Sequence, residues 1–272
     1  MDDPGISVPP TGISGLNRRS LKNMTLGIMQ PYFFPYLGYF ELISRSDHWI
    51  VFDTAQYIRH GWVNRNRILH PTTGWQYIIA PLKQHARETA INQVETQSYD
   101  QWQSRILGQL QHYKKKAPGF ALASGLVEDC LSYGETNLSR LNVITLRKTC
   151  ELLDIPFKCQ IFSEMNLEHG PVDGPGDWAL RISEALHATE YINPPGGLEL
   201  FDQNAFVKSG VKLIIQDPFE FTYQCRGYQF EPGLSVIDVL MWNQPEDIKA
   251  YLTIRKNKSE PQYLQPANEP KL

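Results

Sequence analysis

Tyr36 and Tyr39 are the first residues whose type and spacing could do chemistry, and they bracket Gly38 in the aromatic stretch 30–43. A tyrosine hydroxyl donates and accepts hydrogen bonds, and a glycine lets a ligand approach the backbone closely. The spacing predicts a ligand site with both tyrosines as candidate catalytic groups, beside two further binding candidates, Gln30 and Pro35. The alternative is that these aromatic rings only fill the core.

A second set of polar residues forms the arginine segment, residues 56–68. If the segment is extended, Arg59, Arg65 and Arg67 lie on one side, and the opposite side carries His60, Trp62, Asn64 and Asn66. Arginine binds phosphate through a bidentate fork, and asparagine offers a donor and an acceptor to sugar hydroxyls. We therefore predict a site for a nucleotide-linked sugar, made of Gln56, Arg59, Trp62, Asn64, Arg65, Asn66 and Arg67. The alternative is a solvated hairpin with salt bridges to Asp53 or Glu88.

Asp53 is the leading candidate for a general base. It follows a predicted buried strand, where a carboxylate can orient an incoming amine and take its proton. His60 ranks second and His48 is a further alternative, because the ordinary pKa of histidine lies near neutrality.

Two later segments are weaker binding candidates. Asn193, Gly196 and Gly197 stand in a Pro-Gly-rich turn where a ligand could approach the backbone, although a plain turn explains them nearly as well. Ser235 and Asp238 stand at a predicted helix start, where free N–H groups favour an anion, and ordinary helix capping is the equal alternative. No spacing of ligand residues predicts a metal site, and no cysteine has a neighbouring histidine that would make it a nucleophile.

The composition narrows the class of protein. The chain has 272 residues, 42% of them hydrophobic, with a net charge of −3 and no Lys/Arg run longer than Lys114–Lys116. Nucleic acid is therefore not expected as a partner, although a local patch could bind phosphate. No apolar run is long enough to span a bilayer, and the four cysteines lack paired spacing. We expect a protein of the reducing cytoplasm.

Apolar patterning predicts the elements that position these residues. Strands are predicted at 26–29, 48–52, 75–82, 156–162, 190–193 and 211–215, with short extended pieces at 91–94 and 219–228. Helices are predicted at 37–43, 101–113, 120–133, 138–153, 178–186, 204–209, 236–242 and 244–252. Together they predict one α/β domain over residues 24–252 with a helical insert at about 100–153, between a flexible leader (1–23) and a mobile tail (253–272).

Long motifs give the chain a family resemblance. Residues 30–40, QPYFFPYLGYF, and 51–68, VFDTAQYIRHGWVNRNRI, resemble the WbqC-like protein family, as do YINPPGG at 191–197 and LSVIDVLM at 234–241. The resemblance covers about residues 24–252. It implies a role in polysaccharide (O-antigen) or natural-product pathways, with a glycyl or other acyl group placed on an amino sugar and other pathway enzymes as possible partners.

The Tyr36-Leu-Gly-Tyr39 spacing is also similar to the His-x-Gly-His motif of nucleotidyltransferases and class I synthetases, which lies between the first strand and the first helix. This likeness implies a parallel, Rossmann-like core of that kind and activation of a small carboxylate by ATP with Mg²⁺. The alternatives are a transferase that uses a pre-activated acyl donor and a non-catalytic subunit that binds a nucleotide-linked sugar.

Residues 1–23 have too little apolar content to offset the entropy lost on ordering. We therefore expect a chain that begins at Met24 to fold and to melt at the same temperature as the full chain. Thermal melting of both chains measures this, and a large fall in melting temperature would mean that the leader is docked.

Overall fold

The computed structural model describes residues 24–258 and 262–263. The leader predicted at 1–23 lies outside the described residues, as does most of the tail predicted at 253–272. Residues 253–258, which we predicted to be mobile, instead continue the last helix, α8 (Pro245–Lys258). That helix begins with Glu246 and Asp247 and ends with lysine and arginine, so both of its ends complement the helix dipole.

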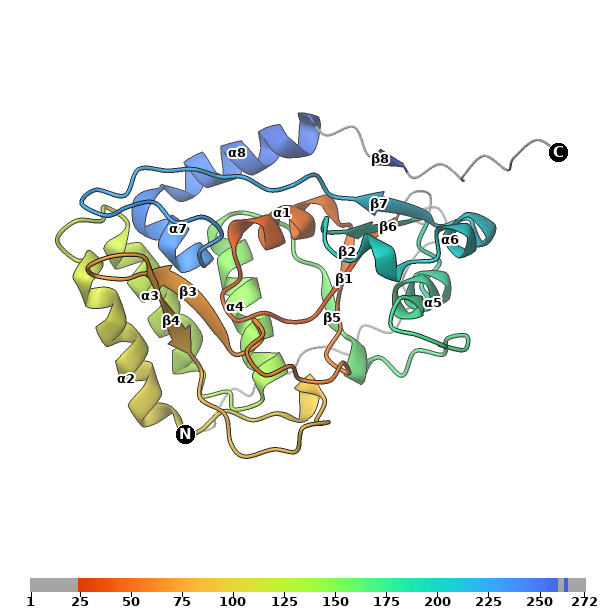
Figure 1. Cartoon of the computed structure of the whole chain (residues 1–272), viewed down its shortest axis with the longest axis horizontal. Helices are drawn as coiled ribbons and strands as arrows, with labels where there is room; N and C mark the ends of the chain where they lie inside the picture. Colours follow the sequence, from red (N-terminus) through yellow and green to blue (C-terminus); the bar gives the residue numbers. More distant parts are fainter. Residues whose placement is uncertain (1–23, 259–261, 264–272) are drawn as a thin grey trace, which may run out of the picture.

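A mostly parallel sheet forms the centre of the fold, as predicted. Its strands lie in the order β5-β2-β1-β6-β7-β8, of which only β8 is antiparallel (Figure 1). Their bounds are β1 (Thr25–Met29), β2 (His48–Val51), β5 (Cys159–Ile161), β6 (Glu190–Asn193), β7 (Lys212–Ile215) and β8 (Gln262–Tyr263). The chain builds outward from β1 to β5 and then returns to the other side of β1. In sheets with this reversal, ligands bind beyond the carboxyl ends of the strands at the reversal, here β1 and β6.

Alternating side chains give the sheet two apolar faces. Trp49 and Val51 of β2 join the larger buried cluster, and Ile50 between them joins the smaller one on the opposite face. The larger cluster is covered by α1 (Leu37–Arg45), α4 (Leu138–Leu152), α7 (Val236–Trp242) and α8. The smaller cluster is covered by α5 (Asp177–Ala185) and α6 (Gln203–Ser209). Helices on both faces of a parallel sheet confirm the α/β class.

The predicted strand at 75–82 is confirmed as a strand at its first five residues, but it lies outside the central sheet. β4 (Trp75–Ile79) pairs only with β3 (Arg65–Leu69), in an antiparallel hairpin separate from the central sheet. The third parallel strand is β5, which follows the helical section. β4 buries Ile78 and exposes Trp75 and Ile79, so it has only one covered face, whereas a central parallel strand has two.

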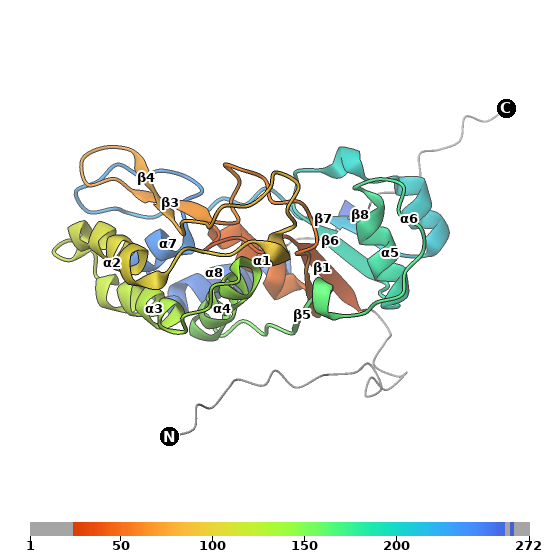
Figure 2. The same cartoon turned by 90° about the horizontal axis from the view of Figure 1, so that it is seen from below.

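The helical section lies where it was predicted. It consists of α2 (Tyr99–Leu110), the short turn η3 (Gln111–Tyr113), α3 (Phe120–Ser132) and α4, which group around the hairpin beside the sheet (Figure 2). Two predicted extended pieces are wrong. Residues 91–94 contain a single 3₁₀ turn, η2 (Ile91–Gln93), and residues 219–228 form an irregular segment. The remaining short turns are η4 (Phe162–Glu164) and η5 (Leu198–Leu200), and none of the described helices could span a membrane.

The start of α3 and the end of α7 are in close backbone contact at Gly119, the residue before α3. The Gly119 N–H donates to the Met241 carbonyl at 2.9 Å, and a Cβ at residue 119 would overlap the Leu240 carbonyl oxygen. We therefore expect Gly119→Ala to lower stability by roughly 1–3 kcal/mol through overpacking.

Gly125→Ala, farther along α3, is the matched control. A Cβ at residue 125 meets nothing within 4 Å, so alanine should leave stability unchanged or raise it by up to about 1 kcal/mol through helix propensity. Denaturant unfolding of both variants measures the two effects. Equal stability of the two variants would contradict the close contact at Gly119.

Candidate functional site

The loop that leaves β1, residues 30–35, is largely buried and has no regular structure. Distant side chains pair its carbonyls. The Asn142 amide donates to Pro31 O at 2.9 Å, and the Asn66 amide donates to Phe33 O at 3.1 Å and Phe34 O at 2.9 Å. The Ser235 hydroxyl also donates to the Phe34 carbonyl, at 2.7 Å. Buried backbone groups need such partners, so these contacts fix the path of the loop.

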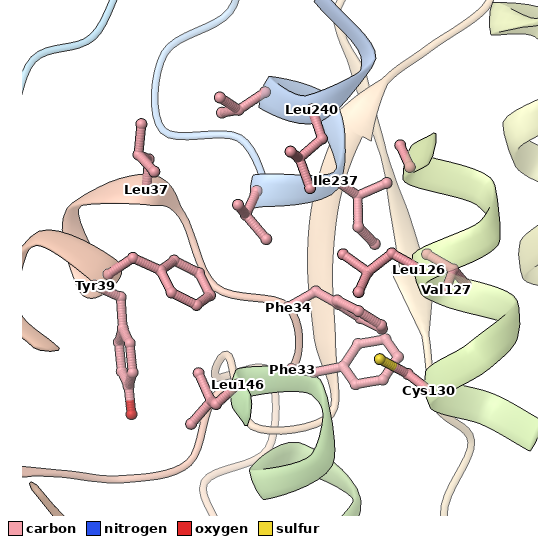
Figure 3. Close-up of a cluster of buried hydrophobic side chains, with 14 of the residues drawn as sticks. Phe33, Phe34, Leu37, Tyr39, Leu126, Val127, Cys130, Leu146, Ile237 and Leu240 are labelled. Atoms are coloured by element: carbon pink, nitrogen blue, oxygen red, sulfur yellow. The ribbon is translucent and has the colours of Figure 1, made fainter. Parts of the chain in front are cut away.

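The aromatic rings of this loop take two different roles. The rings of Phe33 and Phe34 point into the apolar cluster beside Leu126, Val127 and Cys130 of α3 (Figure 3). Tyr39 is also buried, and its hydroxyl donates to the Gln30 carbonyl at 2.8 Å. Tyr36 is only partly buried and lines a cavity. The core-filling alternative therefore accounts for most of the aromatic residues, and Tyr36 alone of the tyrosine pair is open to a ligand.

Gly38 is buried under an aromatic ring. A Cβ at residue 38 would lie 2.8 Å from Cγ of Phe219 and would also overlap the Tyr36 ring. The face of Gly38 that we predicted to meet a nucleotide is thus filled by Phe219. Pro35 is buried beside it, and its carbonyl accepts from the Val236 N–H at 2.8 Å.

A cavity of about 390 Å³ lies next to the start of α1. Aromatic residues dominate its walls, and they come from three places: Tyr36, the irregular segment 219–223, and Phe230. Phe219 packs edge-on to Tyr36, and Tyr223 packs edge-on to Phe230. Glu220 and Thr222 add polar groups to the lining. A concave, mostly apolar site with a few polar groups is the usual form of a small-molecule site.

Asp238 lies buried against the wall of this cavity. Its carboxylate accepts from the Tyr223 hydroxyl at 2.9 Å, from the Leu69 N–H at 2.9 Å and from the Tyr113 hydroxyl. Burial raises the pKa of Asp238 above its ordinary value, although the hydrogen bonds from Tyr113 and Tyr223 oppose the rise. Asp238 is therefore a stronger base than an exposed aspartate, and Tyr223 connects it to the cavity lining.

An aromatic–arginine surface lies on the exposed face of the β3–β4 hairpin. The Arg67 guanidinium stands 5.3 Å from the ring centre of Trp62 and 5.1 Å from that of Trp75, and Arg65 stands 4.1 Å from that of Tyr77. Both indole rings remain accessible, with Trp62 37% and Trp75 39% exposed. Cation–π contacts hold the two guanidinium groups in place beside flat apolar rings.

The predicted alternation holds only inside the strand. Arg65 and Arg67 share the exposed face of β3, as predicted. Trp62 was expected on the opposite face but contacts Arg67, because the chain turns at residues 59–62 and the strand begins only at Arg65. His60 lies in that turn in a left-handed conformation, exposed, with its Nδ1 3.3 Å from the Arg65 guanidinium. Arg59 is exposed in the same turn.

Asn64 and Asn66 face inward from the hairpin. Asn64 accepts from the Tyr57 hydroxyl at 2.9 Å and donates to the Ala80 carbonyl at 3.0 Å. Asn66 is buried and holds the loop at 33–34. Both amides thus bond to protein groups, whereas the neighbouring side chains of Arg65 and Arg67 reach the surface.

The aromatic–arginine surface meets the cavity at Arg67. Its guanidinium donates to the carbonyl of Gly233, which lines the cavity, at 3.2 Å. Its own carbonyl accepts from the Ser235 N–H at 2.8 Å. Ser235 caps α7 by accepting from the Ile237 N–H at 3.2 Å, so the capping alternative describes this residue. Ser235 and Asp238 therefore form the inner support of the site.

The predicted bases lie away from the cavity. Asp53 is buried and accepts from the Ser139 hydroxyl at 3.0 Å, the Ser163 hydroxyl at 2.8 Å and the Ser163 N–H at 3.0 Å. These bonds join the end of β2 to α4 and η4. His48 lies within hydrogen-bonding distance of Gln160, 2.8 Å away, and burial lowers its pKa. The geometry thus gives Asp53 a supporting role, and a catalytic role for it stays a prediction.

The remaining candidates are at separate places. Asn193 ends β6 and donates to the carbonyls of Pro194 and Gly196, so it organises its own turn, and Gly197 supplies the left-handed residue. Gln56 donates to the Arg87 carbonyl at 2.8 Å on an exposed loop. Neither contributes to the cavity lining.

The cysteines are poorly suited to act as nucleophiles. Burial raises the pKa of the Cys130 thiol to about 12 and, with the Asp238 charge, that of Cys225 to about 12. A thiol needs a lowered pKa to form the reactive thiolate. Within the described residues, no group of three or more His, Cys, Asp or Glu side chains could hold a metal ion.

Sequence reasoning missed the binding role of the segment 219–223, which forms one wall of the cavity. Residues 219–228 were predicted only as an extended piece, whereas Phe219, Phe221 and Tyr223 of this segment line the cavity. The sequence around Tyr113 did not indicate its contact with the site, because its hydrogen-bond partner Asp238 is 125 residues away in the chain.

Asn66 offers a direct test of whether its amide serves the fold. We expect Asn66→Ala to lower stability by roughly 1–3 kcal/mol for each carbonyl left unpaired, because the Phe33 and Phe34 carbonyls stay buried. Denaturant unfolding in the absence of any ligand measures this. Asn257→Ala, on the exposed side of α8, is the matched control and should be neutral or slightly stabilising. If the Asn66→Ala variant is as stable as the control, the result would favour the predicted role of Asn66 in ligand binding over a role in the fold.

Comparison with known proteins places the chain in a family. A protein of Mycobacterium tuberculosis (strain ATCC 25618 / H37Rv), described as "Uncharacterized protein Rv1507c", is 29% identical over 223 residues, which are 79% of this chain and 92% of that protein. No solved structure gives a significant match. The model of the WbqC-like protein family matches residues 30–250, a range that includes the loop after β1, the hairpin and α7. The chain therefore belongs to the WbqC-like protein family.

Proposed function

We propose that the protein forms an amide by transferring an acyl group from an already activated donor to the amine of a nucleotide-linked amino sugar. The observation that carries this proposal is the Tyr223–Asp238 hydrogen bond at the wall of an aromatic cavity. The aromatic–arginine surface beside the cavity supports the choice of acceptor. Flat indole rings suit stacking with a base, and Arg65 and Arg67 suit its phosphates.

The buried pair supplies the proton acceptor that amide formation needs. The amine nitrogen attacks the acyl carbonyl carbon, the new C–N bond forms, and the bond from carbon to the donor's leaving group breaks. The nitrogen must also lose a proton. Tyr223 receives it as its own hydroxyl proton passes to Asp238 over the 2.9 Å hydrogen bond. A carboxylate with a raised pKa suits this role, because a general base works best with a pKa near the working pH.

A pre-activated donor fits the site better than ATP does. The face of Gly38 is filled by Phe219, so a nucleotide base does not fit there with Phe219 in this position. The ATP-dependent reaction is nevertheless the second candidate, because the strand order reverses between β1 and β6, the position where many parallel sheets bind nucleotides.

The test offers the full chain a nucleotide-linked amino sugar with either an acyl thioester, or glycine and MgATP. Mass spectrometry of the sugar detects the added acyl mass. We expect product from the thioester alone. Product that requires ATP would replace our proposal with the second candidate. Binding of the sugar without product from either donor would identify a non-catalytic binding subunit that supports other pathway enzymes.

Two variants separate the proton acceptor from the acceptor-binding surface. Tyr223→Phe should lower kcat by about 10²–10⁴-fold with little change in KM, because it breaks the connection to Asp238. Arg67→Ala should raise KM for the sugar about tenfold or more through the loss of a charge-assisted bond. Arg181→Ala on α5 is the control and should leave both constants unchanged. Wild-type kcat in Tyr223→Phe would eliminate the proposed proton path.

A further inference from the structure

A second cavity, of about 770 Å³, lies between two loops that are far apart in the sequence. One wall is the connection between η3 and α3, residues 114–118, and the other is the turn at residues 224–227. Figure 1 shows the two loops side by side, at the end of the molecule farthest from α6. No residue that lines this cavity also lines the aromatic cavity.

Positive charge is concentrated in this second cavity. Lys114, Lys115, Lys116 and Arg226 all contribute to its lining, whereas no aspartate or glutamate does. The whole chain carries a net charge of −3, so its composition does not account for the gathering. Four like charges around one hollow repel each other, and an anion between them removes that cost.

Within residues 24–258 and 262–263, none of these four cations forms an ion pair with a carboxylate. Lysines elsewhere form ion pairs, such as Lys83 with Glu95 and Lys148 with Asp129. None of the four cavity cations has a carboxylate of the described residues within 4.0 Å. They are therefore available to a ligand.

Part of the charge is held in position. The Lys116 ammonium stands 4.1 Å from the ring centre of Tyr228, and the Tyr228 hydroxyl donates to the His112 carbonyl at 3.1 Å. Gly227 adopts a left-handed conformation, which turns the chain beside the Lys116 side chain. The lysine is thus oriented before any ligand arrives, which reduces the entropy lost on binding.

The nearest negative helix end does not cancel this charge. Helix α7 ends at Trp242, which lines the cavity. Two of its last four carbonyls have partners, since Met241 O accepts from the Gly119 N–H at 2.9 Å and Val239 O accepts from the Asn243 N–H at 3.1 Å. These two hydrogen bonds reduce the negative partial charge that the helix end presents to an anion.

We propose that this cavity is a second binding site, which takes the diphosphate group of a soluble ligand. Lysine and arginine are the side chains that bind phosphate oxygens, and a diphosphate carries enough negative charge to contact several of them at once. The volume admits a group larger than a single phosphate. The proposal does not rest on the proposed acyl transfer, because the two cavities share no residue.

The test is a calorimetric titration of the full chain with pyrophosphate at fixed ionic strength. We expect binding to the wild-type protein and at least tenfold weaker binding to the double variant Lys115→Gln/Arg226→Gln. The charge-matched control is Lys208→Gln/Lys258→Gln, on α6 and α8 outside the cavity, which should bind like the wild type. Both variants should melt like the wild type, since the exchanged side chains are exposed.

Further titrations test whether the diphosphate belongs to a nucleotide, and whether this site binds independently of the aromatic cavity. Uridine diphosphate that binds more tightly than pyrophosphate, and loses that binding in the double variant, would assign the site to a nucleotide. Tyr223→Phe should leave pyrophosphate binding unchanged, so this proposal and the acyl-transfer proposal fail separately. Three results would overturn the diphosphate site. The wild type could fail to bind pyrophosphate, or it could bind pyrophosphate no more tightly than the double variant does. The third result is binding of a single-stranded oligonucleotide but not of pyrophosphate.

Discussion

The pairing of the buried carbonyls at residues 31–35 is the constraint on which the rest of this structure depends. β1 must end near Pro31, because proline cannot continue a strand's hydrogen bonds, yet the chain remains buried until α1 begins. Each unpaired carbonyl there would cost roughly 1–3 kcal/mol. The donors come from three distant elements: Asn142 of α4, Asn66 of β3 and Ser235 at the start of α7. One short loop thus connects the sheet, the helical section and the hairpin.

That connection also builds the candidate site. Because Asn66 and Ser235 both hold the Phe34 carbonyl, β3 and the start of α7 lie side by side. Arg67, next to Asn66, then reaches Gly233 at the edge of the cavity. Asp238, in the first turn of α7, accepts from the Leu69 N–H of β3. Phe34 keeps a left-handed conformation in this loop, which a bulky residue rarely adopts unless its surroundings hold it there.

Local patterns predicted the elements well and the roles of the asparagines poorly. The β1–α1–β2 unit follows from its apolar periodicity and its prolines, which are properties of neighbouring residues. Asn64 and Asn66 were predicted to bind a sugar because an amide offers a donor and an acceptor to hydroxyl groups, whereas in the structure they donate to carbonyls that lie outside their own segment. The Tyr223–Asp238 pair and the basic cavity depend on residues brought together by the fold. One sequence shows which residues are present, but it does not show which distant residues the fold brings into contact.

Asp238 weakens the fold at higher pH. Its pKa is raised in the folded state by burial, so the folded protein binds this proton more tightly than the unfolded chain. As the pH rises from the unfolded pKa to the folded pKa, the Asp238 carboxyl ionises in the unfolded chain while it still binds its proton in the folded protein. The free energy of unfolding therefore falls over this range of pH. The three donors from Leu69, Tyr113 and Tyr223 reduce this penalty without removing it. An apolar residue would avoid this penalty, although it would leave the Leu69 N–H and the hydroxyls of Tyr113 and Tyr223 without this acceptor. A buried carboxylate that is joined by one tyrosine to an aromatic cavity therefore fits a role in proton transfer better than a role in stability.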